Sequence, residues 1–332
     1  MGRRERIIRR AVMAAALLGA QGAAPADEAL RQVALKQFGI VAASTDAQRN
    51  APEAQLGRAL FWDTRLSVDG KTACASCHPA QDWGSDRRRF PIDARGKPTS
   101  RHSQTVFNAM GQTTLRWTGD RPDGSAQAEG SMTGSLGFAT KEDAVAALAT
   151  HGYAPRFRAL YPDDAEPLTL RNFGRALAAY QASLATPAPF DRFLAGDGAA
   201  LTAQQQAGLR TFMEVGCGGC HNGPLLGGGM LQRFGLTRDY WTLTGSTVID
   251  TGRFSATKKE EDRYVFRVPM LRNIAKTAPY FHDGSVEHLD AAVRVMAQVQ
   301  LGRLLDDAQA GAIVAFLESL TGEVPSHYAP PP

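Results

Sequence analysis

The chain has 332 residues, of which 43% are hydrophobic and 21% are charged, values that are ordinary for a globular protein. This length exceeds the usual size of a single core and favours two domains. The formal net charge is +4, but residues 1–26 hold five arginines against one glutamate, so the rest of the chain is near neutral. A basic face for binding nucleic acid is therefore not expected.

Residues 1–26 predict a signal for export. The basic start "MGRRERIIRR" precedes the short apolar run "AVMAAALLGAQGAAPA", which offers small-residue cleavage positions near Ala24 or Ala26. The alternative is an uncleaved membrane anchor, but the run is shorter than the roughly 20 residues that span a bilayer. We expect a cleaved signal peptide, a periplasmic protein and no membrane span in the mature chain.

The first part of the remaining chain predicts helices. A short amphipathic helix over residues 56–61 leads into "CASCH", and a similar one over 207–212 leads into "CGGCH". This similarity is a weak internal repeat and suggests two related helical domains. Between the two lies a longer helix, with apolar residues near helical spacing over 168–180, which is expected to pack in the core where the domains join.

The C-terminal part predicts two further helices, one over residues 288–296 and one in "LDDAQAGAIVAFLESLTG" at 305–322, whose apolar stripe over 313–320 ends at Gly322. Strand signals are few and short, the clearest being "YVFRV" at 264–268. The tail over 326–332 is expected to be disordered. The predicted fold class is therefore mainly α.

The four cysteines form two C-x-x-C pairs, Cys74 with Cys77 and Cys217 with Cys220. Disulfides and a zinc ribbon are the alternatives for such spacing in an exported chain. Neither explains why a histidine directly follows each pair, and C-x-x-C-H is typical of covalent haem c attachment. The sequence therefore predicts two haem c groups, with iron bound by His78 and His221. The second axial ligand then decides between electron transfer and chemistry at an open iron.

The sequence resembles the bacterial di-haem cytochrome c peroxidases and their MauG-type relatives. The resemblance covers nearly all of residues 55–325, and its most specific stretch is "VPMLRN" followed by "TAPYFHDGSV". It implies two cytochrome c-like domains, each holding one haem near their interface. The expected boundaries are 27–190 for an N-terminal peroxidatic domain and 191–325 for a C-terminal electron-transfer domain.

The same resemblance assigns further residues around the haems. It implies that His221 and Met296 are the two axial ligands of the electron-transfer haem, and that Trp117 of "RWTGDR" lies between the haems. A methionine at 296, rather than a tyrosine, favours the peroxidase branch over MauG itself, because thioether ligation keeps the potential of that haem high.

Two features depart from the family near the first haem. The loop after "CASCH" contains no histidine, which predicts an iron that is five-coordinate or water-bound from the start. His102 stands where the family usually has an asparagine that helps to bind calcium, whereas Thr277 and Pro279 match that calcium site. The resemblance thus implies a calcium site that His102 weakens, because calcium prefers oxygen ligands.

A further departure concerns the residues expected around peroxide. Gln127 matches the distal glutamine of the family, but Gly137 stands at the place of its catalytic glutamate and Ser131 replaces its proline. The glutamate would move a proton between the peroxide oxygens, so a general acid and base is missing there. Glu129 and Asp123 are substitutes out of register, and they are more simply explained as solvated loop carboxylates.

These features predict a periplasmic di-haem oxidoreductase that reduces hydrogen peroxide to water with electrons from a small cytochrome c or cupredoxin. One alternative is a MauG-like enzyme that uses peroxide to oxidise aromatic residues of a partner protein. The other is a di-haem electron carrier or sensor without peroxidase turnover. A homodimer is expected by analogy with the family.

Overall fold

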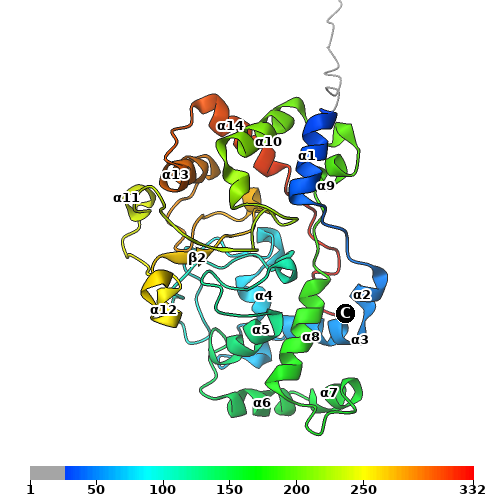
Figure 1. The fold of residues 1–332 in the computed structure, drawn as a ribbon. Helices are drawn as coiled ribbons and strands as arrows, with labels where there is room; N and C mark the ends of the chain where they lie inside the picture. Colours follow the sequence, from blue (N-terminus) through cyan, green and yellow to red (C-terminus); the bar gives the residue numbers. More distant parts are fainter. Residues whose placement is uncertain (1–26) are drawn as a thin grey trace, which may run out of the picture.

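The computed structural model describes residues 27–332, so the signal peptide predicted over 1–26 lies outside the described residues (Figure 1). The described chain is mainly helical, as predicted. Its first half contains helices α1 (Glu28–Phe38), α2 (Asp46–Asn50), α3 (Pro52–Trp62), α4 (Cys74–Cys77), α5 (Gly124–Thr133), α6 (Lys141–Thr150), α7 (Ala154–Leu160) and α8 (Leu170–Ala182). Its second half contains α9 (Pro189–Leu194), α10 (Ala203–Val215), α11 (Trp241–Thr244), α12 (Phe254–Thr257), α13 (Leu289–Leu301) and α14 (Asp307–Glu318).

Within the described residues, the sheet structure is limited to one antiparallel pair of three-residue strands, β1 (Leu231–Arg233) and β2 (Val265–Arg267). Leu231 pairs with Arg267 and Gln232 pairs with Phe266. The strand predicted at 264–268 is confirmed as β2. Within residues 27–332, no helix has both the length and the apolar character needed to cross a membrane.

Side-chain caps explain where the predicted helices begin. The hydroxyl of Thr169 accepts a hydrogen bond from the Asn172 amide at the start of α8, and Thr202 caps α10 in the same way. Asp306 caps α14. Such caps satisfy amide groups that have no partner inside the helix. The helices therefore begin at polar residues that precede the apolar periodic segments.

Buried apolar side chains form two separate cores. The first core, which packs α3, α5 and α8 together, includes Leu60, Phe61 and Phe173. The second core, which packs α10 against α14, includes Phe212 and Phe316. The long predicted helix, α8, has its apolar face in the first core.

The two ends of the described chain pack into opposite cores. Helix α1, at the N-terminal end, places Leu30 and Phe38 in the second core, beside α9 in Figure 1. The tail after α14 crosses to the first half and ends beside α3 and α8, where Tyr328 is only 3% exposed. The expectation of disorder over 326–332 is therefore wrong at Tyr328. Helix α1 lies within the segment 27–190 expected for the first domain, and its apolar side chains pack in the second core.

The two main helix pairs repeat one local geometry. A Cβ atom on Gly57 of α3 would lie 1.9 Å from the carbonyl oxygen of Ala176 in α8. A Cβ atom on Gly208 of α10 would lie 1.8 Å from the carbonyl oxygen of Ala312 in α14. Only glycine permits the two backbones to approach this closely. The weak repeat seen in the sequence therefore corresponds to two matching helix pairs.

Candidate active site

Two neighbouring cavities contain the predicted haem-binding residues. The first cavity is lined by Cys74, Cys77 and His78, and the second by Cys217, Cys220 and His221. All four cysteines are free, and burial raises the pKa of three of the thiols, to about 12 for Cys74 and about 11 for Cys77 and Cys217. Since the pairs line different cavities, they do not assemble the four-thiol site of a zinc ribbon.

In each cavity the histidine of the C-x-x-C-H motif is fixed in the same way. Nδ1 of His78 donates to the Gly84 carbonyl at 2.9 Å, and Nδ1 of His221 donates to the Leu226 carbonyl at 3.0 Å. This bond fixes the tautomer and leaves Nε2 with a free lone pair, as metal-binding histidines require. Burial lowers the pKa of both imidazoles, which keeps them neutral. The donor set of each cavity therefore fits covalent haem c with histidine as one axial ligand.

The second cavity contains the sulfur predicted as the other axial ligand. Met296 of α13 lies in its lining together with His221. The rest of that lining is largely apolar and includes Phe212 of α10 and Leu317 of α14. Met270 lines the same cavity, so this chain offers two thioethers near His221.

The first cavity has a more polar lining. Gln127 of α5 points its Oε1 atom into a buried position without a hydrogen-bond partner. Other glutamines of this lining, which the sequence analysis did not single out, are Gln104, Gln112 and Gln181. Met110 also lines the cavity, but its sulfur packs against Gly124 of α5.

No aspartate or glutamate lies among the described residues that line the first cavity. Glu129 forms an ion pair with Lys141 at 2.6 Å, and Asp123 caps α5 through the Ala126 amide. Gly137 has a φ of 88°, and a side chain there would meet Val68 at 2.6 Å instead of entering the cavity. The predicted lack of a catalytic carboxylate therefore extends to the whole lining.

Trp117 lines both cavities. Its indole Nε1 donates to the His102 carbonyl at 2.8 Å, and its ring lies edge-on to His282 at 6.4 Å between centroids. The His102 amide in turn donates to the His282 carbonyl at 2.7 Å. These bonds hold the indole in one orientation between the two cavities.

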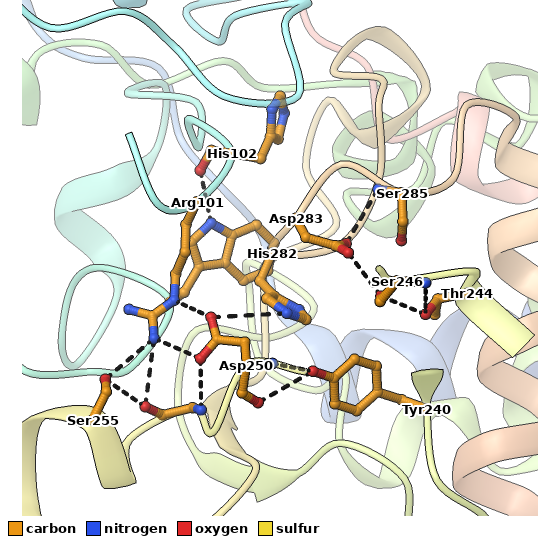
Figure 2. A network of polar contacts seen from close by, with 12 residues as sticks. Arg101, His102, Tyr240, Thr244, Ser246, Asp250, Ser255, His282, Asp283 and Ser285 are labelled. Atoms are coloured by element: carbon orange, nitrogen blue, oxygen red, sulfur yellow. Dashed lines mark hydrogen bonds and ion pairs between the residues drawn. The ribbon is translucent and has the colours of Figure 1, made fainter. Parts of the chain in front are cut away.

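A buried polar network supports this region (Figure 2). Arg101 holds Asp250 through two bonds of 2.7 and 2.9 Å, and Nε2 of His282 lies 3.9 Å from the same carboxylate. Burial by itself would raise the pKa of Asp250, but the bonds from Arg101 outweigh it and lower the pKa. Burial also lowers the pKa of His282. The network therefore carries a fixed negative charge on Asp250 beside a neutral imidazole.

The residues predicted for calcium do not form a typical calcium site. Thr277, Pro279 and His102 line the second cavity together, but the Nε2 atom of His102 is buried there without a partner. Within residues 27–332, no group of three or more His, Cys, Asp or Glu side chains is arranged to hold a metal ion. Since calcium prefers oxygen ligands, a calcium ion here would have to bind backbone oxygens such as those of Thr277 and Pro279.

Comparison with known proteins gives consistent matches. The family model described as "Di-haem cytochrome c peroxidase" matches residues 51–199. A cytochrome c551 peroxidase of Pseudomonas aeruginosa is 40% identical over 276 residues, which cover 82% of this chain and 79% of that protein. The methylamine utilization protein MauG of Methylorubrum extorquens is 30% identical over 81% of this chain and 78% of its own.

A solved structure shares the fold. It is described as a MauG-like protein associated with microbial copper homeostasis, is 26% identical, and superposes with a TM-score of 0.71. The superposition covers 85% of this chain and 92% of that one. The two-core architecture is therefore common to this chain and a MauG-like protein.

Proposed function

The chain belongs to the di-haem cytochrome c peroxidase family, and we propose that it is an exported enzyme that reduces hydrogen peroxide to water. In this proposal a small cytochrome c or cupredoxin supplies the electrons. Two covalently attached haem c groups are the cofactors, one in each cavity.

One observation carries this proposal. Two cavities have the same cysteine and histidine arrangement, but a thioether at the predicted axial position, Met296, faces only the second. A haem with histidine and methionine ligands transfers electrons, whereas an iron with a free face can bind peroxide. Trp117 lines both cavities and supplies an aromatic contact between them.

The protein residues have distinct tasks in this proposal. When bound, the haems would supply redox-active iron and the capacity to store electrons. His78 and His221 would hold the iron through Nε2, since their Nδ1 atoms are bonded to backbone carbonyls. Trp117 is held in one orientation by its bond to the His102 carbonyl.

Gln127 is the residue best suited to bind peroxide. Its buried Oε1 has no partner in the protein and can accept a hydrogen bond from an O–H group of hydrogen peroxide. An amide side chain orients the peroxide but does not take up its proton at neutral pH. Since general acid–base catalysis contributes about 10²–10⁴-fold, we expect slower turnover than in a relative with a carboxylate in this cavity.

The alternatives differ at specific residues. A MauG-like reaction on a partner protein is less favoured because Met296, in place of a tyrosine, keeps the second haem at high potential. An electron carrier or sensor without turnover is favoured by the carboxylate-free first cavity. It is opposed by the unpartnered Gln127, because a buried polar atom without a partner points to a bound molecule.

The central experiment measures turnover directly. Purified protein with two covalently attached haems, counted by haemochrome absorbance per chain, is mixed with reduced cytochrome c or cupredoxin and peroxide. We expect donor oxidation that depends on peroxide. If fully loaded protein oxidises neither class of donor, and its first haem also fails to react with one equivalent of peroxide, the carrier or sensor alternative holds.

Three further parts of the proposal have their own tests. N-terminal sequencing of protein from the periplasm is expected to begin after Ala24 or Ala26. A calcium site at Thr277 and Pro279 predicts that a chelator reduces activity and that added calcium restores it. A homodimer predicts twice the chain mass in solution by light scattering.

A further inference from the structure

Arg267, at the end of β2, is a buried cation without an anionic partner. Its side chain is 1% exposed, and it lies in the lining of the second cavity. Its neighbour Arg272 is equally buried, but Arg272 forms two bonds to the Asp191 carboxylate, of 2.6 and 2.9 Å. Buried charges in proteins are normally paired, so Arg267 is the exception that requires an explanation.

The arginines around the two cavities make this exception clear. Five arginines line the cavities, and four of them form ion pairs: Arg101 with Asp250, Arg116 with Asp120, Arg233 with Asp239 and Arg272 with Asp191. Within the described residues, Arg267 has no carboxylate within ion-pair distance. Burial alone lowers the pKa of its guanidinium, to about 10.

The polar contacts of Arg267 are all neutral. Nε donates to the Arg116 carbonyl at 3.0 Å and Nη2 donates to Oε1 of Gln104 at 2.8 Å. Nη1 donates to Oε1 of Gln112. A guanidinium has five N–H donors, so one hydrogen on each Nη atom remains. These two N–H groups can donate hydrogen bonds to the two oxygens of one carboxylate.

Arg267 also lies at the wall between the two cavities. Its amide donates to the Trp117 carbonyl at 2.7 Å, and Trp117 lines both cavities. Its partner Gln104 lines both cavities and its partner Gln112 lines the first. An anion bound here would therefore sit beside the aromatic contact between the two predicted haems.

We propose that Arg267 binds a propionate carboxylate of the haem in the second cavity through these two N–H groups. This inference rests on the proposed presence of haem c, whose propionates are carboxylates that the chain itself does not supply. The guanidinium neutralises the propionate and so disfavours the oxidised, more positive iron. Arg267 is thereby a positioning residue that raises the reduction potential of the second haem.

The test compares reduction potentials of holoprotein variants. Arg267→Gln keeps hydrogen bonding but removes the charge, and we expect the second haem to favour its oxidised form about tenfold more strongly. The unpaired propionate should then titrate near neutral pH, so that the potential of this variant depends on pH. Arg267→Lys should restore most of the potential. Arg233→Gln, which removes a cavity-lining arginine that is half exposed, should change it little.

Several results would overturn the proposal. One is an Arg267→Gln holoprotein with two attached haems and an unchanged potential and pH profile. Another is a reduction potential of the second haem in the wild type that changes with the anion of the buffer. That result would show that the Arg267 guanidinium binds a free anion and not a haem propionate. If Arg267→Gln does not accumulate, the resonance Raman bending mode of the haem propionate is compared between the wild type and Arg267→Lys. An unchanged frequency of this mode also overturns the proposal. Haem content and peroxide turnover, measured separately, report on the proposed function itself.

Discussion

The first and second halves of the molecule share one scaffold and differ in what it encloses. In each half a glycine brings two helices into backbone contact, and a phenylalanine four residues later, Phe61 or Phe212, lines the cavity. Each half also fixes its histidine through a carbonyl. The shared parts provide the means to hold a haem in either half. The residues opposite each histidine therefore decide what each haem would do.

Apart from the motif histidines, the linings of the two cavities have different chemistry. The second offers Met296 in a largely apolar lining, whereas the first is more polar and offers Gln127, whose Oε1 has no hydrogen-bond partner. A thioether closes an iron and stabilises its reduced state, while amides leave it accessible and orient a small polar ligand. Single substitutions at Met296 or Gln127 should therefore remove this chemical difference between the two cavities.

The largest effect is expected for Met296→Ala, which removes the difference in iron coordination. The oxidised protein should change from one high-spin and one low-spin haem to two high-spin haems by electron paramagnetic resonance. Turnover with a protein donor should fall about 1,000-fold, because the axial ligand sets the haem potential. Met270→Ala is the matched control from the same lining. If Met270→Ala opens the second iron instead, Met296 is not the ligand.

The shared scaffold can be broken equally in both halves. Gly57→Ala and Gly208→Ala each force a methyl group into a backbone carbonyl, and each should lower the free energy of unfolding by about 3 kcal/mol. Gly311→Ala, in α14 with open space around it, should instead raise stability by about 0.5–1 kcal/mol. Urea denaturation measures all three. Unequal losses at Gly57 and Gly208 would contradict the structural repeat.

Gln127→Leu tests the polar character of the first cavity. We expect kcat/KM for peroxide to fall about tenfold, since one hydrogen bond to the bound peroxide is lost. The potential of the second haem should not change. Gln181→Leu is the control, because Gln181 lines the same cavity and was not assigned a role. Equal losses in both variants would show that cavity polarity, and not Gln127, is responsible.

Gly137→Glu asks whether the missing carboxylate can simply be restored. Because φ is 88° and the new Cβ would meet Val68, we expect a loss of about 2 kcal/mol in stability and no gain in turnover. Gly152→Ala, with a φ of 80° and open surroundings, isolates the backbone contribution to this loss. An increase in peroxidase activity of Gly137→Glu would show that the side chain reaches the cavity.

The smallest effect is expected for Tyr328→Phe. The Tyr328 hydroxyl donates to the His78 carbonyl, and its ring packs on Phe107 at 4.8 Å between centroids. Removing the hydroxyl should cost about 1 kcal/mol and alter only the spectrum of the first haem. Tyr328→Ala should cost more, because the ring contacts are lost as well. A spectral change at the second haem would refute this local role.

The sequence was sufficient for features that depend on neighbours along the chain. The attachment motifs, the helices before them and strand β2 follow from spacing and periodicity within short windows. The exchange of chain ends was not predictable in this way, since α1 meets α9 and α10 only after folding. The proline-rich tail suggested disorder, yet Tyr328 provides an aromatic ring that the first core buries. The charge of Arg267 within the apolar "YVFRV" was the one local signal that was overlooked.

The crossed chain ends have a consequence for biosynthesis. The first core contains Tyr328, which leaves the ribosome long after α3 and α8, and the second core contains α1, which must wait for α14. Neither half can complete its core while the rest of the chain is still being made, so folding in sequence, one domain after the other, is disfavoured. Under the proposed export in an unfolded state, this delay would help to keep the chain translocation-competent until both C-x-x-C-H segments have crossed.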